Sequence, residues 1–277
     1  MVSELQITEE PNWIILGSLS SMALFFTFFF GQINVLLYIS LGEFLLFVQK
    51  RRDFRAGLFL AIWLIKPQTL IFILPWLLVT RRFRILTGFG VGSLIILISS
   101  TLIAGGNWFM IWINLLLLYP KGLATTNPLA MMNWRSLALN LEPVIPPFFA
   151  WGIAIAGMML TTFWMIKTWK NRSNESQFAL ALLCTYAATC AVTWHAHIHM
   201  ALPLLAPILV LLANKNFTYK MWYAFVGFPF LGLIISIATK IWFPVNSILP
   251  MTILVINVYL TQWGAKEMEA HINMSFE

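Results

Sequence analysis

Residues 56–79 read AGLFLAIWLIKPQTLIFILPWLLV, an apolar stretch that the pair Lys66-Pro67 interrupts in its middle. A helix that crosses about 30 Å of hydrocarbon needs about 20 apolar residues, and this stretch is long enough. Proline removes a backbone donor and clashes with the preceding turn, and a lysine at bilayer depth is expensive. The stretch therefore predicts two half-helices that meet at Lys66 rather than one straight span.

Two basic runs flank this broken stretch and test how it is threaded. Lys50-Arg51-Arg52 with Arg55 precedes it, and Arg81-Arg82 with Arg84 follows it. Cytoplasmic loops of membrane proteins carry an excess of lysine and arginine, so both runs are expected on the cytoplasmic side. The broken stretch must then enter and leave by the same side, as a re-entrant hairpin. Continuing this threading gives an excess of basic residues inside and places both termini in the cytoplasm.

The rest of the chain extends this pattern into an all-α, polytopic transmembrane helical bundle. The composition is 60% hydrophobic and 10% charged, whereas soluble domains carry about 25% charged residues. We expect about eight spans besides the re-entrant pair of half-helices, at 13–30, 33–49, 85–103, 144–166, 177–194, 198–213, 221–239 and 247–263. All 277 residues form a single transmembrane domain, with a cytoplasmic N-terminus (1–12), a long external loop (104–143) and a cytoplasmic tail (264–277).

Charge and cysteine content exclude two further classes of function. The net charge is +7, but the basic residues fall in short runs between apolar segments, which indicates membrane orientation and no nucleic-acid partner. Cys184 and Cys190 lie within one apolar stretch without metal-ligand spacing, so both are read as small core residues. Gly88 and Gly92 form a small-xxx-small pair, which is typical of close helix packing rather than of a nucleotide-binding loop.

Polar residues without an obvious role in insertion collect on the external side. Gln32 and Asn34 occupy a tight turn between two apolar helices, where their amides could cap helix ends or hydrogen-bond a sugar or phosphate head group. Lys66 needs an anionic partner, a water-filled cavity or a neutral state. The partners considered are Glu43, the carboxylate inside a predicted span, and a lipid phosphate.

The triplet His195, His197 and His199 alternates at the outer end of a span. On a helix His195 and His199 share a face, whereas in an extended turn all three could converge. Interfacial, substrate-contacting and metal-binding roles are the alternatives. Because no further ligand is evident, nor any group that would hold such a ligand in place, we predict no metal site and no certain cofactor.

The external loop contributes Asn133, Trp134 and Arg135, a combination that suits a carbohydrate or phosphate site and equally suits a membrane interface. Glu142 is the carboxylate that this threading leaves outside. It is therefore the candidate general base, although an anion at the start of a helix also suits the helix dipole.

At these residues the sequence resembles the GT-C membrane glycosyltransferases, most closely bacterial glycosyltransferase family 87, the polyprenyl-phosphate-mannose-dependent type. The similar pieces occur in the same order along nearly the whole chain: Gly31-Gln32-x-Asn34, Lys50-Arg51-Arg52, Ala56-Gly57 leading to Lys66-Pro67, Arg81-Arg82-Phe83-Arg84, Asn133-Trp134-Arg135-Ser136-Leu137, and the histidine turn before Leu202-Pro203-Leu204.

The resemblance implies a GT-C-like fold in a bacterial plasma membrane, a polyprenyl-phosphate-linked sugar as donor, and an external glycan or lipid as acceptor. Gln32, Asn34, Lys66, Asn133, Trp134, Arg135 and the three histidines are then substrate-binding residues. The resemblance covers the C-terminal two-thirds of such an enzyme, and the family's catalytic acidic residue lies in an earlier external loop. The chain is then a fragment, the partner of a separate N-terminal polypeptide, or a non-catalytic relative, and alone it should transfer sugar poorly.

A transporter or flippase of polar lipids is the rival interpretation from another class. Such proteins are expected to show internal pseudo-symmetry and paired broken helices in their two halves. The sequence has the break at Lys66 and no visible repeat, which disfavours this interpretation. A non-catalytic membrane subunit is the third alternative.

Overall fold

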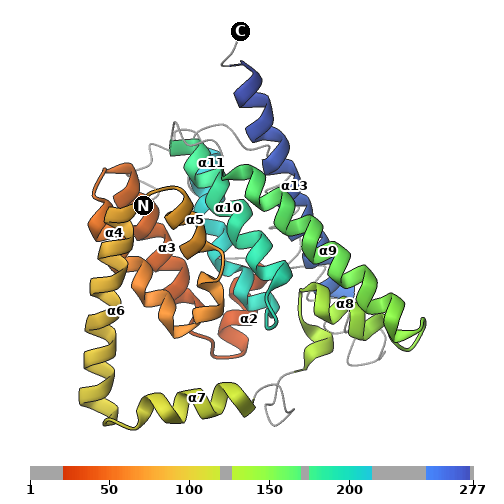
Figure 1. Cartoon of the computed structure of the whole chain (residues 1–277), viewed down its shortest axis with the longest axis horizontal. Helices are drawn as coiled ribbons and strands as arrows, with labels where there is room; N and C mark the ends of the chain where they lie inside the picture. The colour runs from red at the N-terminus through yellow and green to blue at the C-terminus, as the bar shows by residue number, and fades with distance from the viewer. Residues whose placement is uncertain (1–20, 119–126, 170–174, 214–247, 275–277) are drawn as a thin grey trace.

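The computed structural model describes residues 21–118, 127–169, 175–213 and 248–274, and helices are the only regular secondary structure in these ranges apart from an isolated β-bridge (Figure 1). The fold class predicted from the sequence is thereby confirmed as all-α. The N-terminal half contains α2 (Met22–Phe29), α3 (Asn34–Gln49), α4 (Asp53–Leu60), the 3-10 helices η1 (Ala61–Ile65) and η2 (Pro67–Leu70), α5 (Ile73–Val79) and α6 (Phe83–Ala104). The remainder contains α7 (Trp108–Leu118), η4 (Pro128–Ala130), α8 (Trp134–Leu141), α9 (Pro147–Thr168), α10 (Glu175–Val192), η5 (Ile198–Leu204), α11 (Leu205–Ala213) and α13 (Ile248–Met274).

The predicted break at Lys66 is present in the structure. The backbone of Lys66 leaves helical geometry at φ −133° and ψ 74°, which ends η1, and Pro67 opens η2. The first arm, α4 with η1, runs antiparallel to α3: the Ser40 hydroxyl donates to the Phe59 carbonyl (2.6 Å), and Trp63 Nε1 donates to the Leu37 carbonyl (3.2 Å). The two arms are therefore separate helices joined at the lysine.

The second arm returns the chain to the end at which the first arm began. Arg82, just after α5, lies 3.8 Å from the Asp53 carboxylate at the start of α4. The two ends of the segment thus lie at one end of the bundle, so the chain forms a hairpin here, while its re-entrant placement in a membrane remains a prediction.

Glycines let α6 lie directly against the first arm of the hairpin, and the two helices run parallel. A Cβ on Gly57 would overlap the Ile85 carbonyl oxygen, and a Cβ on Gly88 would overlap the Phe54 carbonyl oxygen. Gly92 lies against the Ala61 side chain in the same way. The predicted packing role of the Gly88 and Gly92 pair is confirmed.

Helices occupy the described part of every predicted span, but only α6 and α9 among the described residues are long and apolar enough to cross a membrane by themselves. Both expose most of their apolar surface. Asn34–Gln49, Pro67–Val79, Gln177–Val192 and Ile198–Leu211 are shorter apolar helices. Residues 13–20 and the span at 221–239 lie outside the described ranges. The eight crossings remain a prediction.

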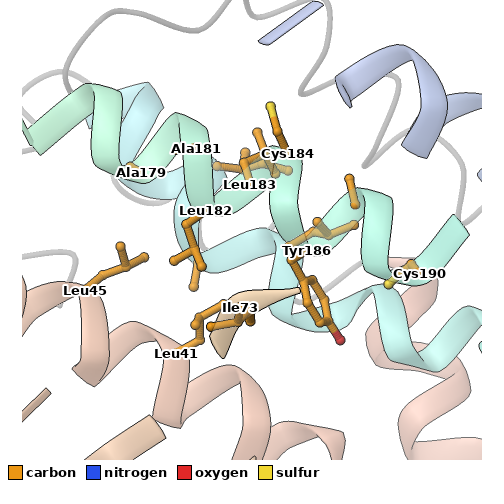
Figure 2. Close-up of a cluster of buried hydrophobic side chains, with 14 of the residues drawn as sticks. Leu41, Leu45, Ile73, Ala179, Ala181, Leu182, Leu183, Cys184, Tyr186 and Cys190 are labelled. Atoms are coloured by element: carbon orange, nitrogen blue, oxygen red, sulfur yellow. The ribbon is translucent and has the colours of Figure 1, made fainter. Parts of the chain in front are cut away.

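The core is centred on α10, which is buried on every side along residues 177–191. Figure 2 shows its side chains facing Leu41 and Leu45 of α3 and Ile73 of α5. The Tyr186 hydroxyl donates to the Met200 carbonyl at 2.7 Å, which ties α10 to η5. Cys184 and Cys190 are buried and free, as expected for small core residues.

Two predicted irregular segments are partly helical. The external loop at 104–143 contains α7, η4 and α8, with 119–126 outside the described residues. The tail at 264–277 continues α13 as far as Met274, because Ala265 to Ala270 are strong helix formers and Glu267 accepts a hydrogen bond from Trp263 Nε1 one turn earlier (3.1 Å). The proposed N-terminal segment 1–12 lies outside the described residues.

Candidate functional site

Lys66 lies at the tip of the hairpin and contacts the turn between α2 and α3. Its Nζ donates a hydrogen bond to Gln32 Oε1 at 3.0 Å, and its side chain is half-buried. Gly31 adopts φ 59°, which closes the C-terminus of α2 and presents Gln32 to the lysine. Gln32 thus meets Lys66 instead of capping a helix end.

The alternative partner for Lys66, Glu43, is not in reach. Glu43 lies about 14 Å further along the α3 axis than Asn34, at a rise of about 1.5 Å per residue, on the side away from the hairpin tip. Among the described residues no ion pair joins the two side chains. Lys66 is therefore a half-buried cation held by a neutral amide.

Asn34 is fully buried at the first position of α3. Within the described ranges, neither its Nδ2 nor its Oδ1 has a hydrogen-bond partner. A buried amide left unpaired costs about 1–3 kcal/mol, so this position needs a reason beyond the helix itself. The helix-capping role considered for Asn34 is absent from the structure.

The three histidines converge because the chain from 195 to 197 is extended rather than helical. The ring of His197 lies 4.9 Å from that of His195 and 5.6 Å from that of His199, measured between centroids. An antiparallel bridge between Met131 and His197 fixes this turn against the segment before α8. Across the described residues, no three His, Cys, Asp or Glu side chains are placed to hold a metal ion.

The charges of Lys66 and Arg135 influence the pKa values of the nearby histidines. Burial, together with smaller contributions from the charges of His197, Lys66 and Arg135, lowers the pKa of His195 to about 4. Burial also lowers the pKa of His197, with a further decrease from Lys66. His195 and His197 are therefore neutral at pH 7. Lys66 of the hairpin tip and Arg135 of α8 both lie near enough to this turn for their charges to act on His195.

Asn133 and Arg135 attach α8 to the end of α10. Asn133 caps α8 by accepting from the Ser136 amide (2.9 Å), and its Nδ2 donates to the Thr193 carbonyl (2.9 Å). The Arg135 guanidinium lies 3.8 Å from the ring centroid of Trp194 and donates to the Trp194 carbonyl at 3.4 Å. Asn133 therefore holds α8 against the end of α10, and Arg135 places a positive charge beside Trp194.

Trp134 points away from these residues. Its Nε1 donates to the Thr161 hydroxyl at 3.0 Å, and its ring packs against Gly157 on α9. The structure thus gives this predicted binding residue a packing role between α8 and α9.

Glu142 lies at the end of α8 and is connected to the histidine turn through two indole rings. Trp151 Nε1 donates to Glu142 Oε1 at 2.7 Å, and the Trp151 ring is stacked 6.5 Å from the Trp194 ring. Trp151 was not anticipated, because a tryptophan near a span end is typical of any membrane interface. Its contact with Glu142 is what distinguishes it.

We define the hairpin-tip cluster as the side chains that this geometry brings together: Gln32, Lys66, Arg135, His195, His197 and His199. Two cationic side chains and several further donors suit an anion with several oxygen atoms. Glu142 lies at its edge and is the available proton acceptor on that side. The arrangement can bind a phosphate and hold a proton acceptor near it.

Comparison with known proteins connects this geometry to an enzyme family. The family model for glycosyltransferase family 87 matches residues 4–193, which is more than half of the chain. The match includes Gln32, Lys66, Arg135 and Glu142, and it ends just before the histidine turn. No curated protein and no solved structure matches the chain significantly. The chain belongs to glycosyltransferase family 87, a membrane-associated family of transferases.

Proposed function

We propose that this chain is a membrane glycosyltransferase that moves a hexose, with mannose as the expected sugar, from a polyprenyl-phosphate donor to an external glycan or lipid acceptor. The observation that supports it most is that Lys66, bonded to Gln32, and Arg135, bonded to the carbonyl of Trp194, both lie near enough to His195 for their charges to act on it. These residues are far apart in the sequence, and they gather positive charge and donors where the chain otherwise exposes apolar surface.

The cluster would bind the donor through its phosphate. The Lys66 ammonium is a compact point charge, and the Arg135 guanidinium can bind two oxygens at once. The neutral imidazoles of His195 and His197 can donate without adding charge. The unpaired amide of Asn34, close in sequence to Gln32, is a further donor and acceptor on this side of the hairpin tip.

Transfer would proceed by direct displacement. The acceptor hydroxyl attacks the anomeric carbon, the bond from that carbon to the phosphate oxygen breaks, and polyprenyl phosphate leaves with the bonding electrons. The hydroxyl proton passes to a base, which is Glu142 or an aspartate supplied by a separate polypeptide. General-base assistance is worth about 10²–10⁴-fold in rate. Lys66 and Arg135 stabilise the charge that develops on the leaving phosphate.

The proposal is tested by reconstituting the purified chain in liposomes with labelled polyprenyl-phosphate mannose and a bacterial lipid extract as acceptor. We expect release of polyprenyl phosphate, reduced at least about 100-fold in Lys66→Met and partly restored in Lys66→Arg. If Glu142→Gln removes the activity, Glu142 is the base, whereas dependence on an added polypeptide assigns the base to that partner. Movement of intact donor across the bilayer without cleavage would contradict the proposal and favour a transporter.

A further inference from the structure

The ends of α2, α3 and α5 form the same helix-terminating turn, but with different residues at its critical position. In each, the residue after the C-cap bonds the carbonyl three residues back, and the next residue bonds the carbonyl five residues back: Gly31 and Gln32 at α2, Arg51 and Arg52 at α3, Arg81 and Arg82 at α5. This is the Schellman motif, whose first outer position adopts a left-handed backbone.

That backbone conformation favours glycine, and two of the three turns have arginine instead. Gly31 has φ 59°, whereas Arg51 and Arg81 have φ 55° and φ 53°. An L-residue with a side chain is strained in this region, so the turns by themselves would be better served by glycine. Both arginines are exposed, and neither side chain makes a hydrogen bond or ion pair with another described residue. Their guanidinium groups are therefore accessible to a partner outside the described fold.

These arginines belong to a larger basic surface at the end of the bundle opposite the hairpin-tip cluster. We call it the arginine collar, and it comprises Lys50, Arg51, Arg52, Arg55, Arg81, Arg82 and Arg84. The Asp53–Arg82 contact brings its two halves together. Among the described residues of the collar segments 50–55 and 80–84, Asp53 is the only carboxylate, so basic residues far outnumber acidic ones within these segments.

Exposed apolar side chains lie directly beside these cations. Leu78 and Val79 end α5 with 57% and 56% of their surface exposed, Phe83 begins α6 at 57%, and Phe54 lies in the first turn of α4 at 44%. A soluble acidic partner would leave this apolar surface in water. A bilayer presents hydrocarbon and phosphate at adjacent depths, which matches apolar and cationic side chains that alternate along the same short segments.

We propose that the arginine collar binds the head groups of anionic phospholipids in the leaflet at the α3 C-terminal end. Arg51 and Arg81 project from their turns toward the phosphates, while Phe54 and Phe83 contact the acyl chains. This site is independent of the glycosyl-transfer proposal, because α3 separates the two by about 24 Å, the length of a sixteen-residue helix.

The test uses the full-length chain in detergent and counts bound lipid by native mass spectrometry with phosphatidylglycerol or phosphatidylcholine as the probe. Each basic residue near an anionic surface contributes about a fivefold preference, so we expect Arg51→Gly/Arg81→Gly to lower phosphatidylglycerol affinity about thirtyfold. Phosphatidylcholine binding should stay within twofold. Because glycine is favoured in both turns, this variant should melt at or above the native temperature.

Two matched variants keep the test decisive. Arg51→Lys/Arg81→Lys retains both charges in the same strained turns and should keep the lipid preference within about threefold. Arg55→Gln/Arg84→Gln removes collar charges from ordinary helical positions and should lower the preference even if the glycine variant folds poorly. Native phosphatidylglycerol affinity in the glycine and glutamine variants would overturn the proposal, as would equal losses for both lipids. Binding of an acidic protein in place of the lipid would overturn it too.

Discussion

The hairpin-tip cluster and the arginine collar are both cationic, but they lie at opposite ends of α3 and differ in burial and in partners (Figure 1). At the cluster, Lys66 is half-buried and hydrogen-bonded to Gln32, beside histidines whose burial keeps them neutral. At the collar, Arg51 and Arg81 are exposed on strained turns. The α2 turn near the cluster has Gly31 where the collar turns have arginine.

The difference shows that charge alone does not mark a reaction site in a membrane protein. Exposed cations at a helix end interact with solvent and head groups at little cost. A half-buried cation held by a neutral amide keeps an unsatisfied preference for an anion. Burial together with convergence from distant segments is what singles out the cluster as the candidate site.

The largest expected effect comes from breaking the packing of α6 against α4 and η1, the arm of the hairpin that runs between the two regions. Gly88→Ala places a methyl group into the Phe54 carbonyl, so we expect the hairpin to separate from α6 and the yield of folded protein to fall at least about tenfold. Gly90→Ala is the matched control on the same helix, because no other atom lies near its Cβ position. Size-exclusion profiles in detergent measure both variants, and an equal yield would contradict the close packing.

A smaller effect concerns the pH dependence of stability at the cluster. The pKa of His195 is lowered from its usual value near 6.5 to about 4, so the unfolded chain binds the proton more readily between these values. We expect the melting temperature to fall as the pH is lowered from about 6.5 toward 4, and His195→Gln to reduce this fall. Bound polyprenyl phosphate should also reduce it, because an anion favours protonated imidazole. A pH profile unchanged by His195→Gln would contradict the burial of this ring.

The smallest effect marks the boundary of the cluster. Trp134→Phe removes the hydrogen bond to Thr161 and should destabilise the protein by about 1 kcal/mol, with donor affinity unchanged. The adjacent variant Arg135→Gln should have the opposite effects: a lower donor affinity and little change in melting temperature. Thermal melts and donor titrations on both variants distinguish the roles, and a loss of donor affinity in Trp134→Phe would move Trp134 into the site.

Much of the fold could be predicted because its causes are local in sequence. The break needs only Lys66-Pro67, the packing of α6 needs only the spacing of Gly88 and Gly92, and the hairpin follows from the flanking basic runs. The sequence did not predict that α13 continues past residue 263. The apolar run ends there, whereas the polar residues that follow still favour a helix.

The site was harder to predict, because its geometry depends on contacts between distant residues. Sequence could nominate Lys66, Arg135 and His195 one by one, but it could not show that they meet around one turn. It could not separate Trp134, which packs on α9, from Arg135 beside it. The contact of Trp151 with Glu142 likewise arises from the packing of α8 against α9.

The most direct test of the difference between the two regions is the affinity for polyprenyl phosphate compared with the uncharged polyprenol. We expect the native chain to bind the phosphate lipid at least about tenfold more tightly, because a hydrogen bond to a charged group contributes about 1.5–3 kcal/mol. With phosphatidylglycerol present in excess to occupy the arginine collar, Lys66→Met should abolish that preference, and Arg52→Gln in the collar should leave it unchanged. Equal binding of the two lipids by the native chain, or a preference that survives Lys66→Met and disappears in Arg52→Gln, would contradict the assignment of the phosphate site to the hairpin tip.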